Sequence, residues 1–207
     1  MVLHLFMISL ILIGIFVIVY LLEIFLGMPF TSALWFDPAT FPTHPWTAIT
    51  SVFLHSPADP MHLLFNAFVL FMFGPILERK IKRNNFIILF LGAGIAGSIT
   101  YYLSSYLNVM LGFSDSLVPA LGASGAIYGV LGALAVLLPG MMIYVWFIPM
   151  RMRTAAMLFV AIELFGSFNA ASGIASAGHL GGLLFGFIFA YYLKNKEKKQ
   201  DNFYSTY

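Results

Sequence analysis

Long apolar runs, separated by short polar stretches, occupy most of the chain. The first run covers residues 3–26 and is interrupted only by His4, Ser9, Gly14 and Glu23. It is too long for the apolar core of a signal peptide, so we expect a retained first span. Because a helix of ~20 apolar residues crosses a bilayer, the runs predict one polytopic domain over residues 1–207. Its six expected spans are residues 3–26, 61–78, 86–107, 123–138, 154–168 and 177–193.

Two stretches break this pattern. Residues 27–60 are dense in proline and aromatic side chains; such prolines prevent a long helix and such aromatics suit the headgroup region. We therefore expect a long, structured first loop lying partly in the membrane interface. Residues 141–150 are apolar and precede Arg151 and Arg153. They form either an interfacial segment or the inner part of the fifth span.

Composition agrees with an all-α membrane protein. Hydrophobic residues make up 61% of the 207 residues and charged residues 9%, whereas soluble domains carry about 25% charged residues. A soluble domain, a disordered chain and a coiled coil are therefore excluded. The net charge of +2 supplies no basic stripe, so we expect no nucleic-acid partner. The absence of cysteine excludes thiol catalysis.

The basic residues predict the orientation. All ten Lys and Arg fall within residues 79–83, 151–153 and 194–199, whereas the loops on the opposite side carry Asp37, Asp59 and Asp115 and no basic residue. Cytoplasmic loops are the ones enriched in Lys and Arg. We expect a multi-pass protein with both termini in the cytoplasm, and we place it in a prokaryotic plasma membrane.

Ser124 is the first candidate for chemistry. It lies in the motif Gly122-Ala123-Ser124-Gly125 at the start of the fourth span. This span is short, at ~22 Å of helix against ~30 Å of hydrocarbon, which would leave Ser124 below the outer surface. Backbone amides at a helix start are unpaired and favour a developing oxyanion. Alternatively, Ser124 is only a helix cap or a small packing residue.

His179 could supply the base that a nucleophilic serine needs. Gly178, Gly182 and Gly186 form a stripe on the sixth span, and a second small-residue stripe on the fourth consists of Gly125, Gly129 and Ala133. Such stripes let helix backbones approach closely. If the two stripes face each other, His179 Nε2 reaches the Ser124 hydroxyl. The alternative is a histidine that is merely hydrogen-bonded within the bundle.

His62 and Asn66 are four residues apart and share one helix face. They could stabilise the negative oxygen of a tetrahedral intermediate, or cap the preceding loop instead. A zinc site at His44, His55 and His62 is disfavoured because no carboxylate stands at ligand spacing, so we expect no metal and no cofactor. Glu163 lies inside the fifth span, either protonated or facing a water-filled cavity.

Together, the Ser124 and His179 motifs and the His62-x-x-x-Asn66 pair resemble the rhomboid family of intramembrane serine proteases. The resemblance covers nearly the whole chain and implies a six-helix rhomboid-like bundle. It implies that Ser124 is the nucleophile and His179 the general base of a dyad without an aspartate. It further implies an oxyanion hole of Asn66, His62 and the Ser124 amide. Supporting positions would be Tyr128, which packs on the base, and the motif glycines Gly122, Gly125, Gly178 and Gly182. Trp46 is followed by Thr47, where the family often has arginine.

The expected function is an intramembrane serine endopeptidase that cleaves transmembrane segments near the extracytoplasmic face. Its partners would be the lipid bilayer and single-pass or polytopic membrane-protein substrates. The small residues at 169–176 suggest a mobile lid, and the fifth span a side gate. One alternative is a catalytically silent rhomboid-like membrane chaperone or helix-binding protein. Another is a small transporter with His179 and Glu163 as a proton relay.

Overall fold

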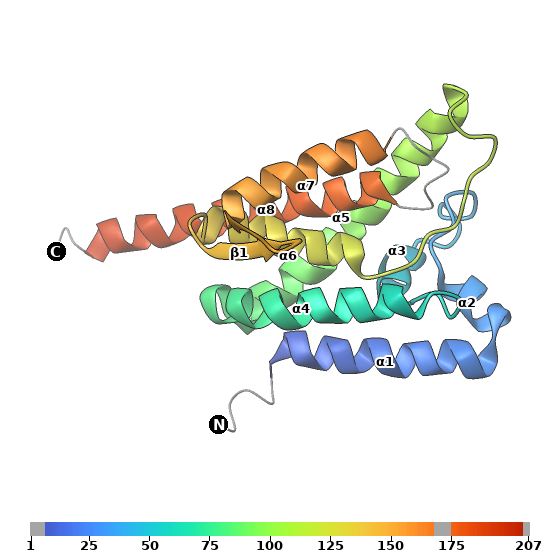
Figure 1. Cartoon of the computed structure of the whole chain (residues 1–207), viewed down its shortest axis with the longest axis horizontal. Helices are drawn as coiled ribbons and strands as arrows, with labels where there is room; N and C mark the ends of the chain where they lie inside the picture. Colours follow the sequence, from blue (N-terminus) through green and yellow to red (C-terminus); the bar gives the residue numbers. More distant parts are fainter. Residues whose placement is uncertain (1–6, 168–174, 205–207) are drawn as a thin grey trace.

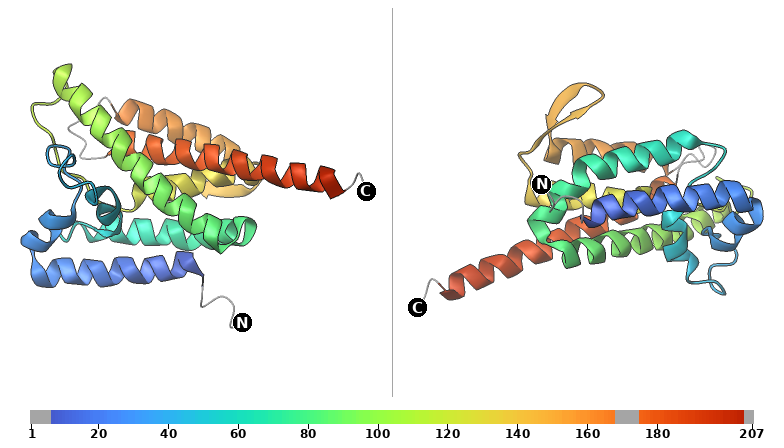
Figure 2. Two further views of the ribbon diagram at one scale, coloured as in Figure 1. Left: turned by 180° about the vertical axis from the view of Figure 1, so that it is seen from behind. Right: turned by 90° about the horizontal axis from the view of Figure 1, so that it is seen from below.

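The computed structural model describes residues 7–167 and 175–204, and it is mostly helical, as the sequence predicts (Figure 1). The elements in chain order are α1 (Ile8–Leu26), α2 (Met28–Leu34), α3 (Thr47–Thr50), the 3-10 helix η2 (Ser51–Phe53), α4 (Pro60–Ile81), α5 (Arg83–Met110), α6 (Ser124–Leu137), β1 (Met142–Val145), β2 (Ile148–Arg151), α7 (Met152–Gly166) and α8 (Ser176–Tyr204). α1, α4, α6, α7 and α8 run roughly side by side, and α5 crosses them obliquely (Figures 1 and 2).

Among the described residues, four helices are long and apolar enough to cross a membrane: α1, α4, α5 and residues Ser176–Lys198 of α8. α6 is apolar but has only 14 residues, and α7 has 15. These helices lie where the six spans are expected, with ends that differ by a few residues. The largest difference is at the carboxyl end, where α8 continues beyond residue 193 into the polar tail, because lysine, glutamate and glutamine are good helix formers. Residues 3–6 and 168 of the expected spans lie outside the described residues.

The proline-rich stretch forms only short helices. α2, α3 and η2 contain seven, four and three residues, respectively. Glu23 of α1 holds this stretch in place. Its carboxylate accepts hydrogen bonds from the His55 backbone amide at 2.9 Å and from the Thr31 hydroxyl at 3.3 Å. A buried acceptor that meets two donors in the loop fixes the path of the chain toward α4.

α1 is held against α4 by a second buried carboxylate. The first amides of α1 have no partner in their own helix, and the Ile8 and Ser9 amides donate to Glu78 at 2.8 and 3.0 Å. A negative charge at the amino end of a helix is also stabilised by the positive end of the helix dipole. Gly74 leaves room for the contact, since a Cβ there would lie 2.6 Å from the Cβ of Ser9. The Glu78 cap therefore joins the two helices at the end of the bundle where α1 begins.

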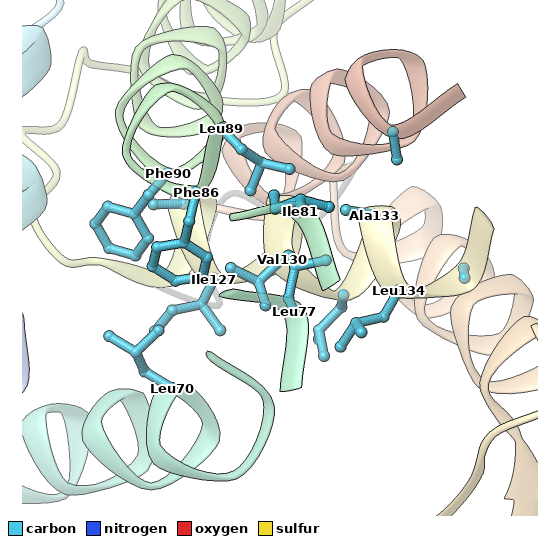
Figure 3. Packing of buried hydrophobic residues seen from close by; sticks show 14 of the residues in the cluster. Leu70, Leu77, Ile81, Phe86, Leu89, Phe90, Ile127, Val130, Ala133 and Leu134 are labelled. Atoms are coloured by element: carbon cyan, nitrogen blue, oxygen red, sulfur yellow. The ribbon is translucent and has the colours of Figure 1, made fainter. Parts of the chain in front are cut away.

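α6 forms the centre of the bundle. Ten of its 14 residues are buried, and Figure 3 shows Ile127, Val130 and Leu134 packed among side chains of α4 and α5, such as Leu77 and Phe90. In a membrane, packing of this kind stabilises mainly through van der Waals contact, because the lipid is as apolar as the side chains. α6 is thus a fixed platform for the serine at its first residue.

The segment after α6 differs from one of the two forms expected for it. Residues 142–151 form an antiparallel hairpin, with Val145 paired to Ile148, so they are not the inner part of a fifth helix. Trp146 and Phe147 make the turn with φ of 46° and 69°, the positive values of a type I′ turn. Figure 2, seen from below, shows the hairpin standing out from the bundle. α7 follows directly and buries Met152, Ala155, Ala156 and Glu163.

Candidate active site

Ser124 is the first residue of α6, and the chain before it is fixed by the first loop. Phe36 and Ala120 exchange two backbone hydrogen bonds of 2.9 and 2.7 Å, and the Gly122 amide donates to Ser51 O at 2.9 Å. Gly122 has a φ of 125°, a backbone conformation that residues with a Cβ rarely adopt. The loop that the sequence predicts to lie in the interface therefore also sets the approach to the serine.

The two glycine stripes face each other. A Cβ added to Gly182 would overlap the carbonyl of Gly125, and one added to Gly186 would overlap that of Gly129. The backbones of α6 and α8 are therefore in direct contact, as small residues at helix interfaces allow. This contact brings Ser124 Oγ to 2.7 Å from His179 Nε2. Gly178, beside the histidine, packs its carbonyl on Gly97 of α5.

Besides the Nε2 contact with Ser124, one face of the His179 imidazole and its Nδ1 edge are also in contact with neighbouring side chains. The phenol ring of Tyr128 stacks on it, with the ring centroids 4.4 Å apart and the planes 4° from parallel. His179 Nδ1 lies 3.0 Å from Oε1 of Glu163, and the Tyr128 hydroxyl donates to the same oxygen at 2.5 Å. The resemblance implies a dyad without an aspartate, and in this structure a glutamate, Glu163, contacts the histidine. Its position inside α7 places it at the Nδ1 edge of the imidazole, where it is buried.

Asn66 and His62 lie on the α4 side. Asn66 is buried, and its Nδ2 donates to Nε2 of His55 at 3.1 Å. The ring of His62 lies beside that of His55, with centroids 5.2 Å apart, and a Cβ on Gly122 would come within 2.6 Å of it. An open cavity of about 990 Å³ joins this side to the serine. The cavity is lined by His62, Asn66, Ser124, Tyr128, Glu163 and His179, among others.

The sequence alone gives His55 no role in the site, and it pairs Glu163 with His179 only as the proton relay of the transporter alternative. His55 is fully buried between Phe16 and His62, and this burial, followed by the proximity of the His62 imidazole, lowers its pKa to about 4. A neutral imidazole accepts the Asn66 hydrogen bond through its unprotonated Nε2. Only the placement of a carboxylate in an apolar span hinted at Glu163. Of the expected lid at residues 169–176, residues 169–174 lie outside the described part of the chain.

These observations define a class of protein: a helical membrane bundle that holds a partly buried serine–histidine pair beside an open cavity. The Rhomboid domain family model matches residues 42–196. The chain therefore belongs to the rhomboid family and is an integral membrane protein.

Named relatives agree with this family. The chain is 36% identical over 151 residues to "Rhomboid protease GluP" of Bacillus subtilis (strain 168), which covers 70% of this chain and 25% of the relative. It is 31% identical over 156 residues to "Rhomboid protein 1, mitochondrial" of Saccharomyces cerevisiae, with 73% and 43% covered. A match to "Putative rhomboid protease YdcA" of Bacillus subtilis (strain 168) is 38% identical over 87 residues, 42% of this chain and 38% of the relative. The chain spans less than half the length of these relatives.

Proposed function

We propose that this protein is an intramembrane serine endopeptidase, with Ser124 as the nucleophile and His179 as the general base. The observation that carries the proposal is the 2.7 Å separation of Ser124 Oγ and His179 Nε2 within a bundle of apolar helices. A serine needs an adjacent base to become nucleophilic, and this contact supplies one. Membership of the rhomboid family and the relatives named as rhomboid proteases support the same reaction.

In the first half of the reaction, Ser124 Oγ attacks the carbonyl carbon of a peptide bond while His179 Nε2 takes the hydroxyl proton. The electrons of the carbonyl move onto its oxygen, and the Asn66 amide, the His62 imidazole and the Ser124 backbone amide are the donors that would stabilise this oxyanion. The carbon–nitrogen bond then breaks, and His179 returns the proton to the leaving amine. An acyl-enzyme on Ser124 remains.

In the second half, His179 takes a proton from a water molecule that attacks the acyl carbon. The tetrahedral intermediate collapses, the proton returns to Ser124, and the carboxylic acid leaves. The open cavity of about 990 Å³ that contains both residues provides room for water and for an extended substrate segment. The serine thus returns to its starting form.

The substrates we propose are transmembrane segments of single-pass or polytopic membrane proteins. A helix hides its carbonyl groups in its own hydrogen bonds, so the segment must unwind before Ser124 can attack. Glycine or proline near the cleavage point favours unwinding, and a small residue is expected before the cut. Ser124 begins the short helix α6, so cleavage would occur near one membrane face.

That face is the extracytoplasmic one in the topology we propose: a single domain with six spans, α1, α4, α5, α6, α7 and α8, in a prokaryotic plasma membrane. The turn between α4 and α5, the hairpin and the end of α8 lie at one end of the bundle (Figure 1), and they carry the basic residues of the chain. The start of α1 lies at the same end. Placing this end in the cytoplasm satisfies the positive-inside rule, and Ser124 then faces the opposite side.

The proposal is tested by cleavage of a model transmembrane substrate in proteoliposomes. The parent protein should release fragments and be labelled by a fluorophosphonate, and Ser124→Ala and His179→Ala should do neither. Ser32→Ala and His44→Ala, which change exposed residues of the first loop, are the matched controls and should cut at the parental rate. Cleavage by Ser124→Ala at that rate would disprove the proposal. Substrate binding by the parent without any fragment would favour a helix-binding protein.

A further inference from the structure

Glu163, Tyr128 and His179 form a connected group around the candidate base. The His179 imidazole lies between two oxygen atoms: Ser124 Oγ at 2.7 Å from Nε2, and Glu163 Oε1 at 3.0 Å from Nδ1. Glu163 is 5% exposed. The order serine, imidazole, carboxylate is the geometry by which a third group orients a base in serine hydrolases of unrelated folds.

The hydrogen bonds around Glu163 fix the protonation pattern of the imidazole. The carboxylate accepts a hydrogen bond from the Tyr128 hydroxyl at 2.5 Å, and the buried Ser176 hydroxyl also hydrogen-bonds to it. An ionised carboxylate only accepts hydrogen bonds, so His179 must donate through Nδ1–H. Its Nε2 then carries the lone pair and faces Ser124, which is the tautomer that a general base requires.

Apart from His179, the Glu163 carboxylate has no basic residue beside it among the described residues of the cavity. No lysine or arginine is among the described residues that line its cavity, whose other titratable side chains are Asp59, His62, His179 and two tyrosines. A buried carboxylate without a counter-charge is costly. When His179 takes the serine proton it becomes that counter-charge, so the pair is stabilised more in the transition state than in the resting enzyme.

We propose that Glu163 is a positioning residue for His179, so that the site functions as serine, histidine and glutamate. This inference rests on the proposed function. In this role Glu163 acts through His179 Nδ1 rather than on the bond that breaks: it holds the imidazole tautomer and stabilises the imidazolium. Tyr128 supports it by donating to the same carboxylate oxygen and by stacking on the ring.

The test is the kinetics of Glu163→Gln in proteoliposomes. The amide keeps the size of the side chain but loses the charge, and its NH₂ group can favour the wrong tautomer. We expect kcat to fall about 10²–10⁴-fold while KM stays within about threefold of the parent. Fluorophosphonate labelling of Ser124 should slow by a factor similar to that of kcat.

Glu163→Asp tests whether the loss of kcat comes from the charge or only from a structural change, because aspartate keeps the charge on a side chain that is one methylene shorter. Its kcat should lie between those of the parent and Glu163→Gln. Glu78→Gln is the matched control: it removes a buried carboxylate that caps α1, and it should reduce stability while leaving kcat near the parental value.

Two results would overturn the inference without touching the proposed function. One is a Glu163→Gln enzyme with parental kcat while Ser124→Ala and His179→Ala are inactive. The other is a Glu163→Gln enzyme that is faster than Glu163→Asp, which would mean that the charge has no part in orienting the base. If the parent itself fails to cleave, the proposed function fails first.

Discussion

The imidazole of His179 lies flat on the phenol of Tyr128, with centroids 4.4 Å apart and planes 4° from parallel. Tyr128 follows Ser124 by one turn of α6, so the helix that supplies the nucleophile also supplies the surface that supports the base. The ring blocks one face of the imidazole and leaves its two nitrogens directed along the line from Ser124 to Glu163.

Changes at Tyr128 should separate the stacking from the hydrogen bond. Tyr128→Phe keeps the ring and loses one hydrogen bond, worth about 1 kcal/mol, so kcat should fall about fivefold. Tyr128→Leu removes the ring as well, and an aromatic pair adds about 0.5–1.5 kcal/mol, so a loss of about 10–100-fold is expected. Proteoliposome cleavage measures both. Equal kcat for the two variants would show that the stacking contributes nothing.

Gly122 should be intolerant of a side chain. Gly122→Ala combines a φ of 125° with a Cβ that would lie 2.6 Å from the His62 ring, so the ring must leave its present position. We expect kcat to fall at least about tenfold, since losing one oxyanion donor can cost about 10²–10³. The matched control is Gly112→Ala, where φ is 73° but no atom lies within 4 Å.

Both alanine variants put a side chain at a positive φ, but only the new Cβ at Gly122 would also meet the His62 ring, so only that change should affect the reaction through His62. Parental kcat in Gly122→Ala would contradict the role proposed for His62. A matching loss of kcat in Gly112→Ala would trace the effect to backbone strain alone.

The contact between α6 and α8 should be sensitive to a single methyl group. In Gly182→Ala the new Cβ would overlap the Gly125 carbonyl, and overpacking of this kind costs about 1–3 kcal/mol. The free energy of unfolding in mixed detergent micelles should fall by that amount. Gly14→Ala, in open space on α1, should leave it nearly unchanged, and equal losses in the two variants would argue against a tight α6–α8 interface.

His55 should make the protein sensitive to acid. Its pKa is about 4 in the folded protein because of burial, against 6.5 for a free histidine. Between these values the unfolded chain binds more protons, so stability is full above about pH 6.5 and falls as the pH drops toward 4. The loss amounts to about 3 kcal/mol. Unfolding measured across this range should show the slope.

The variant His55→Gln cannot titrate but can still accept a hydrogen bond from Asn66, so its stability should vary less between pH 6.5 and 4. His44→Gln changes an exposed imidazole of the same loop and serves as the control. If His55→Gln keeps the full slope of the parent, the acid sensitivity has another origin.

The sequence predicts the helices and the meeting of Ser124 with His179 better than the rest of the molecule. Apolar runs and stripes of small residues are local patterns, and the glycine contact between α6 and α8 is the one that the stripes indicate. Glu163 is different, because it is 16 residues from His179 along the chain and no spacing links them. Its partner follows only from the way α7 packs beside Tyr128.

The hairpin escaped prediction for a reason specific to membranes. Ile143 and Val145 face inward while Met142 and Tyr144 face outward, yet all four are apolar or aromatic. In water the outward residues of a strand would be polar, and the alternation would reveal it. The turn offers no signal either, because Trp146 and Phe147 occupy positions that usually carry asparagine and glycine.

α7 is attached to the bundle unequally at its two ends. Near its start it buries Met152, Ala155 and Ala156, whereas farther along Glu163 is the only buried residue among the described positions of this helix. An outward swing of that end would pull Glu163 away from His179. Admission of a substrate past α7 and alignment of the base would then compete for one hydrogen bond. The base would then be misaligned while α7 is open and aligned again once α7 closes. Membrane helices that pass the open site without being enclosed would not be cleaved.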